Sequence, residues 1–162
     1  MSFRVGLGFD VHAFAAPDAR RKLVLGGVEI PFGGGGLLGH SDADVLSHAV
    51  TDALLGAAGL EDLGHYFPDT DERYRDADSI ELLREARTLV GDSWRVANVD
   101  AVVICERPKV RDHREAMRMN LAGALGVEPA RVGVRGTTTE RLGFTGRGEG
   151  IAAQALCLLE GR

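Results

Sequence analysis

Three side chains in this sequence have the chemistry and the spacing of a metal site. Asp10 and His12 lie two residues apart in an alternating stretch, so both point to the same face if that stretch is a β-strand. His48 follows in a segment with helical periodicity, and His40 stands eight residues before it. A catalytic zinc takes three carboxylate or imidazole ligands and keeps one position open. The pattern predicts a zinc site of Asp10, His12 and His48; the alternative is a solvated strand face and a surface histidine.

A second candidate site is the glycine-rich loop over residues 136–150, which reads GTTTERLGFTGRGEG. Its three consecutive threonines bring hydroxyl groups, and the backbone N–H groups of such a turn suit phosphate oxygens. Glu140 adds a hard carboxylate of the kind that magnesium or manganese uses beside substrate phosphates. The loop therefore predicts a phosphate and metal site, with an ordinary glycine-rich connection as the alternative.

Two other segments carry weaker signals. The carboxylates clustered over residues 62–71, in DLGHYFPDTD, are typical of helix caps and turns. The glycine run at residues 33–36 lacks the Gly-Lys-Ser/Thr ending of a P-loop, so it is predicted to be a flexible connection.

The opening strand, residues 3–14, must position the first two ligands. Its apolar and its small or polar residues alternate, and the two sets are Val5, Leu7, Phe9 and Val11, and Gly6, Gly8, Asp10 and His12. We expect the apolar face to pack on helices, and the two glycines to let another group approach the backbone on the opposite face.

The remaining elements follow from periodicity and turn residues. A hairpin is predicted over residues 22–32 with its turn at Gly26 and Gly27. Helices are predicted over 42–59, 78–91 and 111–126, and strands over 96–106, 131–136 and 150–160. The near-continuous apolar run of 96–106 indicates a central strand. This order predicts an α+β fold of a single domain, residues 1–162, in two layers with a mixed β-sheet covered by helices on one face.

Apolar stripes predict the core of each helix. Ser41 or Asp42 is expected to cap the first helix, and Asp78 or Ser79 to start the second. The expected core positions are Leu46, Val50, Ala53, Leu54 and Ala57 in the first helix, Leu82, Leu83, Ala86 and Val90 in the second, and Ala116, Met119 and residues 121–125 in the third. Cys105 and Cys157 lie in apolar runs without metal or redox spacing, which predicts small buried side chains.

The bulk composition restricts the class of partner. The chain has 162 residues, 44% of them hydrophobic, and a formal net charge of −5. An acidic chain without a basic run does not favour nucleic acid, so an anionic substrate must be attracted locally. Lys22 and Lys109 are the lysines of a chain whose cations are otherwise arginines. Because no leader or membrane-spanning segment is evident, we expect a cytoplasmic protein.

Five motifs together give a family resemblance. GFDVHAF (8–14), HSDADVLSHAVTDALLGAAGLEDLG (40–64), FPDTD (67–71), ERPK (106–109) and TTTERLGFTGRGEGIAAQA (137–155) occur in this order over nearly the whole chain. The combination resembles the 2-C-methyl-D-erythritol 2,4-cyclodiphosphate synthases of the non-mevalonate isoprenoid pathway. The resemblance implies that the chain converts 4-diphosphocytidyl-2-C-methyl-D-erythritol 2-phosphate to the cyclic diphosphate and CMP.

The resemblance also implies cofactors and site residues. Asp10, His12 and His48 bind zinc, Glu140 holds a second divalent cation (Mg²⁺ or Mn²⁺), and His40 and Thr138 stabilise the transition state. The methylerythritol and ribose side is lined by Ser41, Asp62, Leu63, Gly64, Phe67, Pro68, Asp69, Thr70 and Asp71. The cytidine side is lined by Cys105, Glu106, Arg107, Pro108, Lys109, Val110 and Arg111, and further substrate contacts come from Asp10, Val11, His12, His40, Thr137, Thr138, Thr139, Glu140, Phe144 and Arg147.

The family assembles as a homotrimer with active sites between subunits. Phe144 and Arg147 match family positions that face a central cavity, where an isoprenoid diphosphate can sit. Two other functions share some of these features: a zinc phosphohydrolase acting on a nucleotide-linked substrate, and a non-enzymatic trimeric binding protein with a structural zinc.

Overall fold

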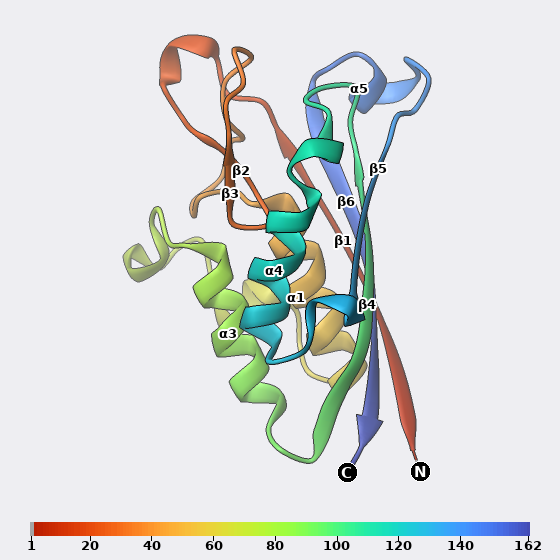
Figure 1. Ribbon diagram of the computed structural model, residues 1–162. Helices are drawn as coiled ribbons and strands as arrows, with labels where there is room; N and C mark the ends of the chain where they lie inside the picture. Colours follow the sequence, from red (N-terminus) through yellow and green to blue (C-terminus); the bar gives the residue numbers. More distant parts are fainter. Residues whose placement is uncertain (1) are drawn as a thin grey trace.

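A four-stranded mixed sheet forms one layer of the protein (Figure 1). The computed structural model describes residues 2–162. The strands lie in the order β1 (Phe3–Ala13), β6 (Gly150–Gly161), β4 (Trp94–Ile104) and β5 (Val132–Thr137). β1 and β4 run antiparallel to β6, whereas β4 and β5 are parallel. The mixed sheet and the inner position of β4 confirm the prediction.

Three helices form the second layer, all on the same face of the sheet (Figure 1). They are α1 (Val45–Ala58), α3 (Ser79–Val90) and α4 (Arg114–Leu125). α1 packs directly on β1 and β6, α3 packs on α1, and α4 packs on α3 and β5. The prediction of an α+β fold with helices on one face is confirmed.

Several short elements have no periodicity by which the sequence could predict them. α2 (Leu63–Tyr66) and α5 (Gly143–Gly146) are helices of about one turn. Single 3₁₀ turns occur at Pro17–Ala19, Glu72–Tyr74, Val110–Asp112 and Pro129–Arg131. These pieces connect the main elements, and three of them lie in segments that carry predicted site residues.

The predicted hairpin forms, but apart from the main sheet. β2 (Leu23–Leu25) and β3 (Val28–Ile30) pair with each other in a separate two-stranded sheet. Gly26 and Gly27 have φ values of 57° and 69°, as a two-residue turn of the mirror-image type requires. Both backbone N–H groups of this turn donate to the carboxylate of Asp44, at 2.9 and 2.7 Å.

The observed N-cap of α1 differs from the predicted one. Its side chain accepts from the backbone N–H of Ser47 at 3.0 Å and from the Ser47 hydroxyl at 2.7 Å, so Asp44, not Ser41 or Asp42, is the N-cap. The fully buried carboxylate thus joins the hairpin turn to the first turn of α1. By contrast, Asp78 caps α3 at Ser79 as predicted.

The opening strand has its faces the other way round from the prediction. Val5, Leu7 and Phe9 are exposed to 67%, 58% and 57%, whereas Gly6 and Gly8 are buried against α1. The alternation was predicted correctly, but the apolar face points away from the helices. The physical reason is that only a face without side chains lets the backbone of α1 come this close to the strand.

The distances leave no room for a larger residue on that face. A Cβ atom at Gly6 would lie 2.1 Å from the carbonyl oxygen of Ala53, and one at Gly8 would lie 1.9 Å from that of Ala49. Both obstacles are backbone atoms of α1, so relief requires the whole helix to move. The glycines therefore set the spacing between β1 and α1.

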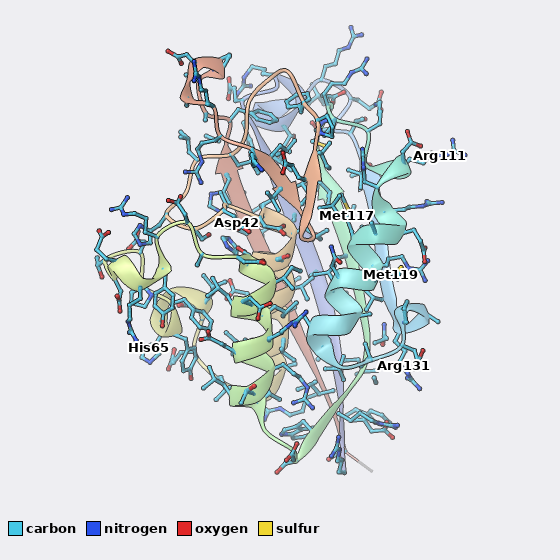
Figure 2. All side chains as sticks on the ribbon, turned by 60° about the vertical axis from the view of Figure 1, so that its left-hand side comes forward. Asp42, His65, Arg111, Met117, Met119 and Arg131 are labelled. Carbon is cyan, nitrogen blue, oxygen red and sulfur yellow. The ribbon has the colours of Figure 1, made fainter. Side chains whose placement is uncertain are left out.

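The phase of α4 also differs from the prediction. Met117 is fully buried whereas Met119 is 58% exposed, on the outer side of the helix (Figure 2). Ala116 is exposed as well, while Leu121 and Leu125 are buried as expected.

The predicted core positions of α1 and α3 are buried, and so are both cysteines. Within residues 2–162, no helix has the length and apolar character needed to cross a membrane.

We predict that Gly6→Ala lowers the free energy of unfolding by about 1–3 kcal/mol, because the added methyl group overlaps α1. The matched control is Gly56→Ala on α1, where a Cβ atom would lie 3.9 Å from the Leu7 carbonyl oxygen, an ordinary contact. This control should raise the free energy of unfolding by about 0.5–1 kcal/mol through helix propensity. Urea denaturation measures both, and a Gly6→Ala protein as stable as Gly56→Ala would contradict the packing argument.

Candidate functional site

The three predicted metal ligands meet at the end of β1 and the first turns of α1. The side chains of Asp10 and His12 point toward the helix, from the same face of β1 as the buried glycines. Oδ2 of Asp10 lies 3.0 Å from Nε2 of His12 and 3.0 Å from Nδ1 of His48. The two imidazole nitrogens are 3.2 Å apart, and all three ligand atoms lie within 4.8 Å of one another. The structure thus brings together the predicted set.

The backbone carbonyl of Leu38 fixes which nitrogen of His12 is free. Nδ1 of His12 lies 2.6 Å from this oxygen, and a carbonyl can only accept a hydrogen bond. Nδ1 therefore carries the hydrogen, and Nε2 of the neutral ring faces Asp10 and His48 with a lone pair. A carboxylate and an imidazole lone pair aimed at one point require a cation or a proton between them, so the donor set fits a divalent metal ion.

At both Asp10 and His12, burial and hydrogen bonding act on the pKa in opposite directions, and hydrogen bonding together with charge has the larger effect. Burial acts to raise the pKa of Asp10, but the hydrogen bonds and positive charge that the His12 and His48 rings offer when they are protonated outweigh it and hold the pKa well below its usual range. Burial acts to lower the pKa of His12, but the hydrogen bond and charge of Asp10 outweigh it and raise the pKa. A metal ion must displace the proton that protonated His12 carries on Nε2, so metal affinity should fall as the pH is lowered.

His40 lies beside the acidic segment that was predicted to line the same site. Its Nε2 lies 2.9 Å from the backbone carbonyl of Asp71, and its own carbonyl accepts from the backbone N–H of Asp76 at 2.8 Å. Asp62 caps α2 through the N–H of His65, and Asp71 accepts from the N–H of Arg73. The capping role expected for this segment is therefore present, and the segment also holds His40.

The glycine-rich loop holds Glu140 in a defined conformation. Glu140 and Arg141 both have positive φ, at 53° and 67°, and the N–H of Arg141 donates to the Glu106 carboxylate at 3.1 Å. The Thr138 hydroxyl donates to Oε1 of Glu140 at 2.8 Å. The side chains of Thr138 and Glu140 thus contact each other, and Glu106 connects their loop to the 105–111 segment.

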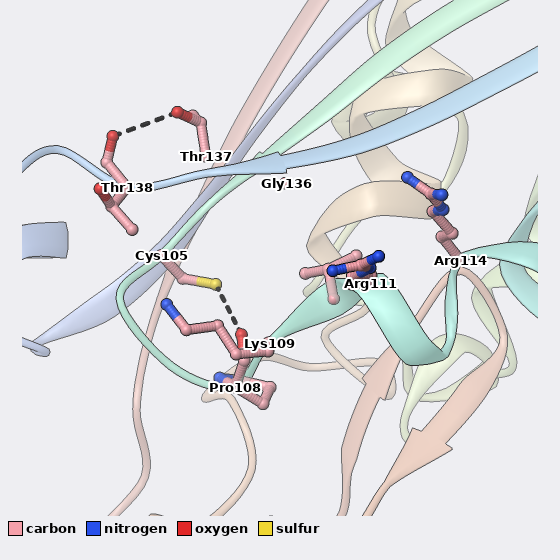
Figure 3. A pocket seen from close by; sticks show the side chains of 9 residues that line it. Cys105, Pro108, Lys109, Arg111, Arg114, Gly136, Thr137 and Thr138 are labelled. Atoms are coloured by element: carbon pink, nitrogen blue, oxygen red, sulfur yellow. Dashed lines mark hydrogen bonds between the residues drawn. The ribbon is translucent and has the colours of Figure 1, made fainter.

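A cavity of about 260 Å³ lies where this loop meets the 105–111 segment (Figure 3). Predicted residues line it, namely Cys105, Pro108, Lys109, Val110, Arg111, Thr137 and Thr138, together with Gly136 of the predicted loop and Arg114, which was not predicted. Lys109, Arg111 and Arg114 supply positive charge at the cavity of an acidic chain. Arg114 begins α4 and gives no sequence signal beyond being an exposed cation.

Other predicted residues lie outside this cavity. Glu106, Arg107 and Arg147 border a second cavity with Phe14 and Phe32. Phe144 is 37% exposed, and the Arg147 guanidinium pairs with Glu149 at 2.7 Å. Within residues 2–162, none of the three metal-ligand candidates borders either cavity.

Two residues near the metal-ligand candidates were not predicted to belong to a functional site. Asp42 and Ser79 contact each other at the start of α3, and Ser79 contacts His48. Asp42 stands in the same short motif as Ser41, and Ser79 lies 31 residues beyond His48. The sequence shows them only as cap candidates, because nothing local brings the two segments together.

Comparison with known proteins points to one family. The sequence model of the YgbB family matches residues 3–160. A Rubrobacter xylanophilus protein named 2-C-methyl-D-erythritol 2,4-cyclodiphosphate synthase is 78% identical over 158 residues, which are 98% of this chain and 95% of that protein. An Azoarcus protein of the same name is 58% identical, over 97% of this chain and 95% of its own length.

Solved structures give the same result. The bifunctional IspDF of Campylobacter jejuni matches with a TM-score of 0.92 and 44% identity, over 99% of this chain and 43% of that longer chain. IspF of Plasmodium falciparum, solved as a CDP complex, matches with a TM-score of 0.85 and 33% identity, over 99% of this chain and 97% of that one.

We predict that Asp10→Asn loses zinc, because the neutral amide keeps the shape of the side chain but not the charge that a carboxylate ligand provides. Zinc content after dialysis, measured by mass spectrometry, tests this. Asp52→Asn is the matched control, since Asp52 lies on α1 and accepts from the N–H of Leu63 instead of joining the three ligand atoms. Full zinc occupancy of Asp10→Asn refutes the assignment.

We also predict that both cysteines of the native protein resist alkylation at pH 8. Burial raises the pKa of the Cys105 thiol to about 11 and that of Cys157 to about 12, so the reactive thiolate is scarce. Iodoacetamide should modify both at ordinary rates only in urea, as followed by intact mass spectrometry. Rapid addition of an alkyl group to the native protein would contradict the prediction, and peptide mapping would show which of the two cysteines is accessible.

Proposed function

The chain belongs to the YgbB family, and we propose that it converts 4-diphosphocytidyl-2-C-methyl-D-erythritol 2-phosphate to 2-C-methyl-D-erythritol 2,4-cyclodiphosphate and CMP. The observation that carries this proposal is the convergence of Asp10, His12 and His48 on one point, in a chain 78% identical to a named synthase. In the reaction, a 2-phosphate oxygen forms a bond to the β-phosphorus. The bond from that phosphorus to the bridging oxygen breaks, and CMP leaves with the electron pair.

Asp10, His12 and His48 would hold zinc, and Glu140 would hold Mg²⁺ or Mn²⁺. When bound, these cations supply Lewis-acid polarisation of the phosphate groups and neutralise charge on the leaving CMP. The attacking group is already an oxyanion, so the protein needs no general base, and orientation of the two phosphates is its main contribution.

The residues around the two proposed metal positions are held by hydrogen bonds within the chain. The Leu38 carbonyl orients His12, and the Asp71 carbonyl orients His40, which we propose stabilises the transition state. The Thr138 hydroxyl, which donates to Glu140 at 2.8 Å, is the second group proposed for this role. Groups fixed in this way need little reorganisation during the reaction.

We propose that the cavity at Lys109 takes the cytidine and its phosphates. Its cations attract an anionic nucleotide to a chain whose net charge is −5. The Plasmodium falciparum relative is a complex with CDP, which supports a nucleotide ligand for this family. The remaining residues of the 105–111 segment, and those of the 62–71 segment, are proposed to contact the base and the methylerythritol.

We further propose a homotrimer with active sites between subunits. The sheet face opposite the helices exposes a row of apolar side chains on β1, including Val5, Leu7 and Phe9, and continues to Leu156 on β6. Burial of such a face in an assembly removes its apolar surface from water. Phe144 and Arg147 are proposed to face a central cavity that accepts an isoprenoid diphosphate.

The test is incubation of the full chain with the proposed substrate, zinc and magnesium, followed by phosphorus NMR. We expect CMP and a cyclic diphosphate without release of inorganic phosphate. Glu140→Gln should lower kcat by roughly 100-fold or more, because the carboxylate proposed to hold the second cation is lost and with it the charge neutralisation that this cation supplies. The control Glu29→Gln changes a carboxylate that pairs with Lys22 on the hairpin, and should leave kcat unchanged.

Other products identify other functions. Inorganic phosphate in place of the cyclic product would indicate a zinc phosphohydrolase. A His48→Ala variant that unfolds would indicate a structural zinc in a binding protein, whereas a folded, metal-poor and inactive variant supports the proposed synthase.

A further inference from the structure

His48 has a second set of contacts on the side away from Asp10. Its Nε2 lies 2.9 Å from Oγ of Ser79 and 3.2 Å from Oγ of Ser41. Ser79 is completely buried, and its hydroxyl is hydrogen-bonded to Oδ1 of Asp42. We propose that Asp42 and Ser79 are positioning residues that keep the hydrogen of His48 on Nε2, so that Nδ1 is free to bind the metal ion. The inference rests on the proposed metal centre.

The direction of each hydrogen bond follows from the partners of Asp42. Its carboxylate accepts from the backbone N–H of Ser79 at 3.0 Å and from that of Asp44 at 3.1 Å, and backbone N–H groups can only donate. A carboxylate held as an acceptor in this way takes the hydrogen of the Ser79 hydroxyl as well. Oγ of Ser79 then offers His48 only lone pairs, so Nε2 must carry the hydrogen.

The consequence appears on the opposite side of the ring. The Asp10 carboxylate lies 3.0 Å from Nδ1 and would accept a hydrogen there, so the contact with Ser79 on the other side of the ring decides between the two tautomers. With its hydrogen on Nε2, a neutral His48 has its lone pair on Nδ1, which also lies 3.2 Å from Nε2 of His12. Histidine ligands depend on such a partner for their tautomer and ring orientation, and loss of the partner typically weakens metal binding about 10–100-fold.

The neighbouring hydroxyl of Ser41 explains why the position of the hydrogen on His48 depends on Ser79. Its hydroxyl oxygen accepts from the N–H of Ala43 at 3.2 Å, and its hydrogen can turn toward Nε2 of His48. Without Ser79, the Ser41 hydroxyl becomes a donor to Nε2, and the histidine hydrogen moves to Nδ1, where it blocks the metal. The hydroxyl of Ser79, bound to Asp42, prevents this exchange.

The chain contains a matched control for the loss of a buried serine hydroxyl. Ser47 is also completely buried, and its hydroxyl donates to an aspartate, Asp44, at 2.7 Å. Ser47 precedes His48 in the sequence, but its hydroxyl bonds the α1 cap and not the metal-ligand candidates. Ser47→Ala therefore reports the effect of a lost buried hydrogen bond on stability alone.

Zinc affinity and a spectroscopic signature test the inference on the full chain. We expect Ser79→Ala to bind zinc about 10–100-fold more weakly in competition with a chromophoric chelator, and to change the visible spectrum of the cobalt-substituted protein. Ser47→Ala should lose thermal stability but keep wild-type affinity and spectrum. Ser79→Thr, which retains the hydroxyl, should restore affinity to within about threefold of wild type.

A measurement without metal separates this inference from the proposed function. Two-bond proton–nitrogen correlation spectra of the metal-free protein at pH 8 should show His48 with its hydrogen on Nε2, and Ser79→Ala should lose this tautomer. Wild-type affinity in Ser79→Ala, or equal weakening in Ser47→Ala, overturns the inference. Absence of zinc binding by the wild type, with the Nε2 tautomer intact, overturns the proposed metal centre and leaves the hydrogen-bond chain as a structural feature.

Discussion

The close approach of α1 to β1 sets the position of the helix layer and of the three metal-ligand candidates. Gly6 and Gly8 present no side chains to the helix, so backbone meets backbone along the strand. Toward its far end, the same face of the strand carries Asp10 and His12 in place of glycine, and there the first turns of α1 bring His48. A wider spacing would separate the ligand atoms, which now lie within 4.8 Å of one another.

Each metal-ligand histidine is oriented by a group on its other side. The Leu38 carbonyl contacts Nδ1 of His12, and the Ser79 hydroxyl contacts Nε2 of His48. Ser79 is held to the start of α1 by Asp42, which accepts from the N–H groups of Ser79 and Asp44. Leu38 is instead held to the end of β1, because its N–H donates to the Ala13 carbonyl. The end of β1 and the starts of α1 and α3 thus supply both the three metal-ligand candidates and the groups that orient their imidazole rings.

The outer face of the sheet and the charge distribution have complementary roles. The exposed apolar row on β1 is the surface that supports the proposed trimer, and the cations at the Lys109 cavity supply local positive charge in an acidic protein. The cations fit a family member that acts on an anionic substrate. The five motifs in order had already indicated this family from the sequence.

The main helices and strands, the mixed sheet with helices on one face, the family and the three metal-ligand candidates could be predicted from the sequence, because periodicity and motif spacing are local properties of the chain. The sequence could not determine which face of β1 is buried, since alternation is the same for both faces and only packing against α1 distinguishes them. The phase of α4, the cap at Asp44 and the contact of Ser79 with His48 were likewise decided by tertiary structure. Each depends on segments far apart in the chain, which only the folded protein brings within hydrogen-bonding or packing distance.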